Sequence, residues 1–368
     1  MSKAAELANL IGNINMGGGG VNRNLVINGA MNVSQRGTVT GVANNGYTLD
    51  RFAFTYSQDG AFTVTQDSSS PDGFANSLKV DVTGADSSLA ASQYLIMEHK
   101  IEAQNLQHLH FGKSSAKNIV LSFYVKSNKT GTYGVSIIQS DNSSKIANLT
   151  YTINSADTWE QKSLTFTGDT SGVINDDNGI GLKLGFTLAV GSTWTSGDTS
   201  ASFRTFANGN YGAGQTVNIL DHVDNEWFIT GVQLEVGQNP TEFEHEPVDR
   251  TLAKCQRYFQ QWTQEASGFA TNNYAVVAAS VMHGNTYAFM QYHHPVDLRA
   301  TPALTFNGSF QTNNNGANRA ASSMAINTKT PHVTSFSAAI PDNSEGGQAG
   351  FFRAANDADA SIFFDSEL

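Results

Sequence analysis

Short segments rich in β-branched and aromatic residues follow one another from residue 21 to about residue 248, and no helical pattern separates them. Each segment is bounded by Gly, Asn, Asp or Ser, which favour turns. In 122–126 and 162–167, apolar and polar residues alternate with the period of two expected for a half-buried strand. About ten such strands without interleaved helices predict an all-β fold, a two-sheet sandwich of the jelly-roll type. The expected strands are 24–33, 50–56, 62–66, 77–84, 118–127, 132–139, 148–154, 161–169, 181–190 and 226–237.

The charge composition limits the partners that this chain can have. It has 21 Lys and Arg against 32 Asp and Glu, a net charge of −11, and only 14% of its residues are charged. Such a surface repels phosphate backbones and anionic lipids, so we expect neither nucleic acid nor a membrane surface as a partner. No apolar stretch approaches the roughly 18 residues of a membrane span, and the first ten residues lack the pattern of a secretory signal. We therefore expect a chain made in a reducing cytoplasm and not inserted into membranes.

The N-terminal segment, residues 1–20, has the pattern of a helix followed by a joint. Ala4, Leu7, Ile11 and Ile14 recur at 3-4-3 spacing and form one apolar stripe. A helix of about four turns with one such stripe is not stable alone in water, so it must dock on a partner protein or on copies of itself. Packing on its own domain is the simpler alternative. The glycine run 17–20 favours an anchor, because four glycines make a flexible connection.

The chain turns near residues 240–247, and the segment 251–262 then predicts a second helix or helical turn with one apolar face. Cys255, the only cysteine, lies on that face, so no intrachain disulfide exists and the thiol is expected in the core. Further strand-like runs continue to the C-terminus. The sequence therefore predicts an anchor and hinge at 1–20, a jelly roll at 21–248, and a smaller β-sandwich with a leading helix at 249–368.

Two aromatic residues in glycine-rich loops are the candidate ligand-binding residues. Trp194 lies in GSTWTSGD and Tyr211 in NGNYGAG, and aromatic faces exposed at loops can stack on the apolar faces of sugar rings. The alternative for each is a hydrophobic plug under its loop. Trp159 and Trp227 border or lie within strand-like runs, so we expect both in the core.

The sequence contains no arrangement that calls for a metal, a cofactor or catalysis. His108 and His110 have a spacing that would place both on one side of a strand, but no third ligand is near. The acidic turn 175–179 lacks the terminal Glu of a calcium loop. No nucleophile elbow, zinc motif or short β-helix repeat is present. We therefore expect no enzyme, although a pair of carboxylates in a glycosidase cannot be identified from sequence alone.

Four blocks of sequence resemble one class of proteins. NLVINGAMNVSQRGT (24–38) and GYTLDRF (46–52) are similar to the opening of many bacteriophage tail-fibre and virion proteins. ITGVQLEVGQNPTEFEHEPVDRTLAKCQRYFQQW (229–262) resembles a junction in the same proteins, where a jelly roll like a carbohydrate module passes into a terminal β-domain with a CQRYY-type helix. HPVDLRATPALTF (294–306) resembles part of that terminal domain.

The resemblance implies a location and a role. It implies a virion appendage assembled in the host cytoplasm, a homotrimer anchored to other tail or virion proteins by its N-terminal helix. It also implies host attachment, which the predicted loops would carry out by binding a cell-surface glycan. A purely structural role as a tail adaptor, head fibre or decoration protein is the first alternative. A glycan depolymerase is the second.

Overall fold

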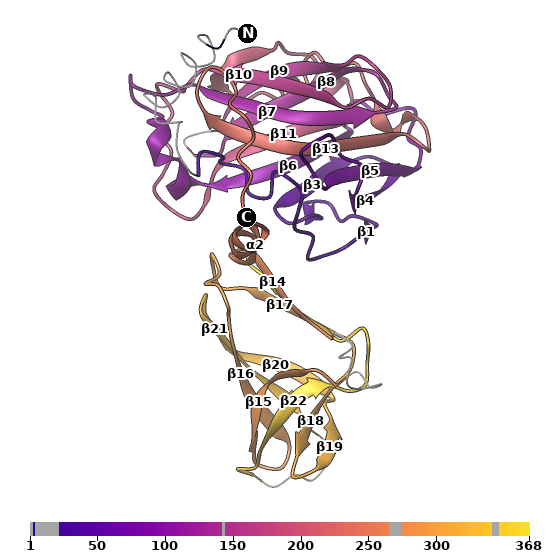
Figure 1. Cartoon of the computed structure of the whole chain (residues 1–368), viewed down its shortest axis with the longest axis vertical. Coiled ribbons are helices and arrows are strands. Elements are labelled where there is room, and N and C mark those ends of the chain that lie inside the picture. The colour runs from indigo at the N-terminus through magenta and orange to yellow at the C-terminus, as the bar shows by residue number, and fades with distance from the viewer. Residues whose placement is uncertain (1–2, 4–21, 142–143, 265–273, 341–345) are drawn as a thin grey trace. The chain divides into compact units, whose positions relative to one another are not determined.

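The chain forms two compact units in a computed structural model. The structure describes Lys3 and residues 22–141, 144–264, 274–340 and 346–368. The first unit comprises residues up to Thr251 together with Leu368, and the second comprises Leu252–Glu367. Each unit is predominantly β and is described by itself below (Figure 1). The expected N-terminal helix with Ala4, Leu7, Ile11 and Ile14 lies outside the described residues.

The first unit is a sandwich of two antiparallel sheets, which we call sheet I and sheet II. Sheet I has six strands in the order β1 (Val39–Thr40), β4 (Ala61–Asp67), β5 (Ser77–Gly84), β13 (Glu226–Val236), β7 (Ile119–Ser127) and β10 (Glu160–Phe166). Sheet II has seven strands in the order β12 (Ser200–Thr205), β9 (Lys145–Ile153), β8 (Gly131–Gln139), β11 (Ile180–Val190), β6 (Tyr94–Glu102), β3 (Phe52–Ser57) and β2 (Gly46–Tyr47). This arrangement agrees with the expected jelly-roll-like fold.

Aromatic side chains join the two sheets. Phe123 of sheet I lies between Tyr151 and Phe186 of sheet II, with ring centroids 5.0 and 5.1 Å away and nearly perpendicular planes. Trp227 of sheet I is fully buried beside Phe186. These contacts join the two sheets into one core, as expected from strands whose alternate side chains face inward.

The described residues of this unit include four short 3₁₀ helices in its loops. They are η1 (Ala103–Leu109), η2 (Ser192–Trp194), η3 (Asn208–Asn210) and η4 (Ile219–Asp221). None of the described helices in the chain is long and apolar enough to cross a membrane.

The prediction of a strand at 24–33 is wrong. Asn28 and Met31 have φ angles of 63° and 57°, in the left-handed region that interrupts a strand. The Asn28 side chain accepts a hydrogen bond from the Val33 N–H and donates to the Val33 carbonyl oxygen. Local bonds from an asparagine side chain therefore take the place of ladder bonds, and the segment forms turns.

Four strands described in the first unit were not predicted from the sequence. Two of them, β1 and β2, are only two residues long. The others are β6, which pairs with both β3 and β11, and β12, which pairs with β9 at the edge of sheet II. The remaining predicted strands of the first unit are confirmed in position.

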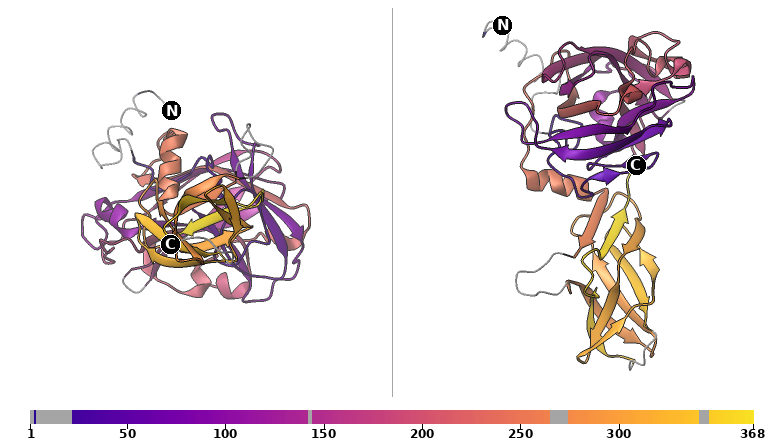
Figure 2. Two further views of the ribbon diagram at one scale, coloured as in Figure 1. Left: turned by 90° about the horizontal axis from the view of Figure 1, so that it is seen from below. Right: turned by 90° about the vertical axis from the view of Figure 1, so that its right-hand side faces the viewer.

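The second unit is a smaller β-sandwich. Its two sheets share a core in which Tyr292 stacks on Phe364 at 4.6 Å and Phe310 stacks on Phe352 at 5.2 Å. Its strands are coloured orange to yellow in Figures 1 and 2. One sheet has the order β14 (Phe259–Thr263), β23 (Ser361–Asp365) and β17 (Ala303–Asn307). The other has the order β19 (Ala317–Ala320), β18 (Phe310–Asn314), β22 (Ala349–Ala354), β15 (Val276–His283), β16 (Tyr287–His293), β21 (Val333–Ala339) and β20 (Ser323–Lys329).

The helix predicted at residues 251–262 is shorter in the structure. Helix α2 (Val248–Gln256) begins directly after Pro247, and the Tyr258 N–H then donates to the Cys255 carbonyl in a turn. The following residues form β14 and pair with β23 instead of continuing the helix. Aromatic residues at 259 and 262 fit a half-buried strand better than a helix end. Cys255 is fully buried, as expected.

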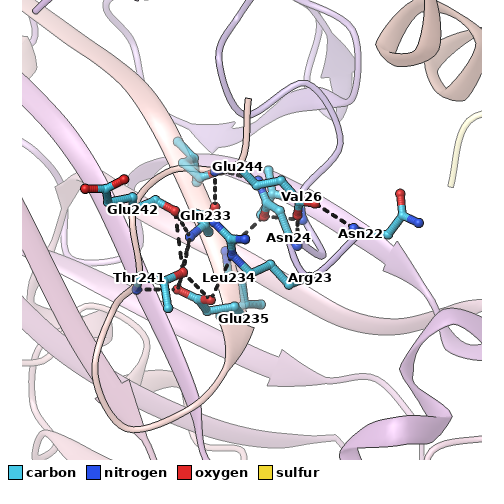
Figure 3. A network of polar contacts seen from close by, with 11 residues as sticks. Asn22, Arg23, Asn24, Val26, Gln233, Leu234, Glu235, Thr241, Glu242 and Glu244 are labelled. Atoms are coloured by element: carbon cyan, nitrogen blue, oxygen red, sulfur yellow. Dashed lines mark hydrogen bonds and ion pairs between the residues drawn. The ribbon is translucent and has the colours of Figure 1, made fainter. Parts of the chain in front are cut away.

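A buried carboxylate fastens the beginning and the end of the first unit to β13 (Figure 3). Glu235 is fully buried and accepts hydrogen bonds from the Thr241 N–H at 2.8 Å and its hydroxyl at 2.7 Å. The Arg23 guanidinium lies 3.4 Å from the same carboxylate. Glu244 accepts from the backbone N–H groups of Asn22 and Asn24. Segments more than 200 residues apart in sequence are therefore held side by side.

We expect Glu235→Ala to lower the free energy of unfolding of the first unit by about 1.5–3 kcal/mol, because Thr241 and Arg23 lose a charged partner in a buried place. Urea denaturation followed by tryptophan fluorescence measures the change. Glu226→Ala on the same strand is the control. It removes a partly exposed ion pair with Lys79 and should cost less than about 1 kcal/mol. Equal losses for both variants would contradict a central role for Glu235.

Candidate binding site

A pocket of about 340 Å³ lies on the outer face of sheet II, and we call it the Trp194 pocket. Strands of sheet II form its floor, and two loops form one wall: the β11–β12 loop, which carries η2, and the loop after β12, which carries η3. Both candidate ligand-binding residues of the sequence line it. The lining residues are Thr55, Tyr94, Glu98, Ile138, Ser144, Lys183, Trp194, Phe206, Asn208 and Tyr211.

Strand alternation explains the floor of the pocket. On β6, Leu95 and Met97 are fully buried in the core between the sheets. Tyr94 and Glu98 therefore point to the opposite, outer face. A small second cluster covers this face, where the partly buried Tyr94, Trp194 and Phe206 pack against a buried group that includes Tyr211.

Trp194 is half-buried and held in a defined orientation. Its indole N–H donates to the Ser92 carbonyl oxygen at 2.9 Å. Its ring meets Tyr94 edge to face, with centroids 4.9 Å apart. An edge-to-face partner covers only part of an indole, so part of Trp194 stays accessible from the pocket. This position suits the stacking role predicted from the sequence.

Tyr211 differs from the expectation of a ring displayed on a loop. It is only 7% exposed, and its hydroxyl donates to Glu98 Oε1 at 2.7 Å. A Cβ atom at Gly185, on the strand below, would lie only 2.9 Å from Ser136 Oγ, so the absence of a side chain there leaves room for the Ser136 hydroxyl. Tyr211 therefore supports the wall of the pocket and fixes Glu98, while Trp194 offers the more accessible surface.

The environment of Tyr211 changes its acidity. Burial raises the pKa of the Tyr211 hydroxyl well above its usual value of 10, and the neighbouring Glu98 carboxylate raises it further. The hydroxyl stays protonated in the folded protein and remains a hydrogen-bond donor to Glu98 at neutral pH.

The pocket holds one cationic and one anionic group. Lys183 on β11 is partly exposed and makes no ion pair with any described residue. Among the described residues that line the pocket, Glu98 is the only carboxylate. The amide of Asn208 and the hydroxyl of Thr55 add neutral donors and acceptors. Aromatic surface beside mixed polar groups can bind a ligand that combines apolar faces with hydroxyl groups.

Trp159 and Trp227, which the sequence predicted to lie in the core, differ in burial. Trp227 is fully buried, which confirms the core assignment. The assignment of Trp159 to the core is wrong, because it is only partly buried and lies beside Phe228 with ring centroids 6.2 Å apart. It precedes β10 at the edge of sheet I, where few residues are available to cover it.

Sequence reasoning missed Tyr94, Glu98, Lys183 and Phe206. A signal for the first two was present, because Leu95, Met97 and Ile101 share one parity along a strand-like run, which places Tyr94 and Glu98 on the opposite face. No local signal marks Lys183, since only its placement opposite β6 and β8 brings it into the pocket.

The histidine pair and the acidic turn have structures of their own. His108 lies in η1 and His110 ends it in a left-handed conformation, so the expected strand placement is wrong. Asp177 accepts from the Gly179 N–H, and Asn175 donates to Asp141. Among the residues that the structure describes, no group of three or more His, Cys, Asp or Glu could hold a metal ion.

No protein-family model matches this chain, and no curated protein matches it. Among solved structures it is similar to the enzymatically active domain of tailspike protein 4 of bacteriophage CBA120, with 13% identity and a TM-score of 0.32 over 58% of this chain and 21% of that one. It is also similar to a CBM4 module, with 14% identity and a TM-score of 0.30 over 57% of this chain and 99% of that one. A third similar structure is the family 11 carbohydrate-binding module of Clostridium thermocellum Lic26A-Cel5E, with 12% identity and a TM-score of 0.29 over 56% of this chain and 98% of that one.

We expect Tyr211→Phe to destabilise the first unit by about 1.5–3 kcal/mol at pH 7, because the buried Glu98 carboxylate loses its donor. The variant should also change how the free energy of unfolding falls at alkaline pH. The folded pKa of Tyr211 is above the unfolded value, so its contribution is complete below pH 10 and falls as the pH rises beyond it. Denaturant midpoints from pH 7 to 11 measure both effects.

Tyr94→Phe is the matched control, since no described partner bonds the Tyr94 hydroxyl in the same pocket. Its midpoint should stay within about 0.5 kcal/mol of wild type. A Tyr211→Phe protein as stable as Tyr94→Phe, with an unchanged fall of the free energy of unfolding at alkaline pH, would contradict the assigned hydrogen bond.

Proposed function

We propose that this protein is a bacteriophage appendage protein that attaches the virion to its host by binding a cell-surface glycan in the Trp194 pocket. One observation carries the binding part of this proposal. The partly accessible ring of Trp194 borders a pocket that also holds the Lys183 ammonium and the Glu98 carboxylate. A pyranose ring has an apolar face that can stack on the indole and hydroxyls that can both donate and accept hydrogen bonds.

The size and the charge of the pocket support a glycan. Its volume of about 340 Å³ is at the lower end of the roughly 300–1,000 Å³ range of ligand pockets, which suits a few units of a longer chain. The Lys183 ammonium can donate to a hydroxyl oxygen, and Glu98 can accept from a hydroxyl group. One ammonium and one carboxylate give the pocket lining no net charge, which suits a neutral glycan.

The proposal assigns binding without catalysis. A glycosidase uses two carboxylates on opposite sides of the scissile bond. Glu98 is the single acid among the described residues of the pocket wall, and its Oε1 accepts from Tyr211. The residues of this pocket therefore give no support to the alternative hypothesis of a glycan depolymerase.

The location on a virion rests on the sequence resemblance at 24–52 and 229–306. A single shallow site with one main stacking ring binds weakly, because the loss of ligand freedom offsets much of the contact energy. A homotrimer displayed in several copies per particle would raise the overall avidity without new contacts. We propose this arrangement as the reason for a weak site on an appendage.

We expect Trp194→Ala to weaken binding of the fluorescently labelled protein to host cells at least tenfold, because stacking surface is lost. Half-saturation concentrations measured by flow cytometry report the change. The matched control is Trp159→Ala, which removes a partly buried tryptophan from the other sheet and should bind like wild type. If both variants bind equally well, the glycan site lies elsewhere. Release of reducing sugar from host polysaccharide would instead favour a depolymerase.

A deletion tests the anchoring role of residues 1–20 separately. We expect the shortened protein to stay folded and to keep its glycan affinity while failing to enter virions, because the stripe of Ala4, Leu7, Ile11 and Ile14 is gone. Immunoblots of purified particles measure incorporation, and light scattering measures the oligomer. Wild-type incorporation of the shortened protein would place the anchor in another segment.

A further inference from the structure

A second pocket lies on the outer face of sheet I, and we call it the Phe74 pocket. Its volume is about 430 Å³. Tyr124 on β7 contributes to its floor, Phe74 and Asp72 come from the turn between β4 and β5, and Glu242, Phe243 and His245 come from the segment that follows β13. Sheet II and its pocket lie on the opposite side of the sandwich, so the two pockets share no residue.

Four rings gather in this pocket. The Phe74 ring lies 5.0 Å from Phe243, 5.2 Å from His245 and 5.4 Å from Tyr124, all at inclined angles between 42° and 66°. Phe74, Tyr124 and Phe243 are half-buried, and His245 is exposed. Rings that meet at such angles cover each other's faces only in part, so aromatic surface remains open to the pocket.

The backbone of β13 makes room for these rings. Gly231 has a φ of +61° and lies where the register between β13 and β7 shifts. A Cβ atom there would lie 2.7 Å from Phe74 Cζ and 3.0 Å from Tyr124 Cδ2. The pocket floor therefore depends on a residue without a side chain in a conformation that favours glycine.

The segment that carries Phe243 is fixed on both sides. Its neighbour Glu244 accepts from the N–H groups of Asn22 and Asn24, and the Glu244 N–H donates to Gln233 Oε1 at 2.8 Å. On the other side, the Glu242 carbonyl oxygen accepts from Arg23. The polar network of Figure 3 thus holds the Phe243 wall in place before any ligand arrives.

The charge of this pocket differs from that of the Trp194 pocket. Asp72 and Glu242 are exposed, and the Glu242 carboxylate points away from the network in Figure 3. None of the described residues that line the pocket is Lys or Arg. Lys126 is on the same face of β7, but its ammonium lies 4.1 Å from the Phe228 ring centroid and donates to Ser69 Oγ. The pocket therefore offers hydrogen-bond acceptors and disfavours anions.

We propose that the Phe74 pocket is a second glycan-binding site, selective for pyranose units without an acidic group. The aromatic surface stacks on the sugar ring, while Asp72 and Glu242 accept hydrogen bonds from hydroxyl or ammonium groups. Gln161, directly opposite Tyr124 across β10 and β7, adds an amide. Binding on both outer faces of the sandwich would let one copy hold two glycan chains. This site stands on its own residues and does not depend on the Trp194 pocket.

Fluorine NMR of the full-length protein labelled with 3-fluorotyrosine tests the proposal. Tyr124 reports on the Phe74 pocket and Tyr94 on the Trp194 pocket, each assigned with its Tyr→Phe variant. The probes are cellohexaose (neutral), chitosan hexamer (amino) and a galacturonate hexamer (acidic). We expect the Tyr124 signal to shift in a saturable way with at least one of the first two and not with the acidic probe.

Two variants and two controls separate binding from folding. Phe243→Ala should weaken the response of Tyr124 at least tenfold and leave the Tyr94 response unchanged, and exposed Phe351→Ala in the second unit is its control. Glu242→Gln should weaken the chitosan response more than the cellohexaose response, with exposed Asp176→Asn as control. Three results would overturn the second site, whatever the Tyr94 signal does. The Tyr124 signal could fail to shift with either non-acidic probe, or it could shift equally with the acidic probe. The third such result is a Tyr124 shift in Phe243→Ala as large as in the wild type.

Discussion

Alternation of side chains along paired strands is the constraint on which both faces of this sandwich depend. Burying Leu95 and Met97 between the sheets obliges Tyr94 and Glu98 to face outward. A slip of one residue would exchange the two sets and empty the core of apolar groups, so the core fixes the register of the outer surface as well. The Trp194 pocket is thus built on the reverse side of the same strands that stabilise the fold.

A surface defined by strands becomes a pocket only when loops are held above it. Over sheet II, the buried hydrogen bond from Tyr211 to Glu98 holds the loop that follows β12 close to the strands, and the Gly212 N–H of that loop donates to the Trp194 carbonyl oxygen. Over sheet I, buried Glu235 and its partners hold the segment that carries Phe243. In both places donors satisfy a buried carboxylate: Tyr211 bonds Glu98 from 113 residues away, and Thr241 bonds Glu235 from six residues away. These bonds fix the geometry before a ligand binds.

The local pattern of the sequence predicted much of the fold and part of the site. Most strands were recognisable because alternation and turn residues act over a few positions, and Trp194 and Tyr211 stood out in glycine-rich loops. The failures have physical causes. The sequence of residues 24–33 predicts a strand, but hydrogen bonds from the Asn28 side chain take the place of hydrogen bonds to a neighbouring strand. Glu98 lies 113 residues from Tyr211 in the chain, and a contact at that separation leaves no trace in a local pattern.

The crystal structure of the full-length protein with an oligosaccharide purified from the host surface tests the central claim most directly. The account predicts a sugar ring stacked on the indole of Trp194, with hydroxyl groups within hydrogen-bond distance of Lys183 Nζ and a carboxylate oxygen of Glu98. A glycan bound elsewhere on the protein, with the Trp194 pocket unoccupied at saturating ligand, would contradict it.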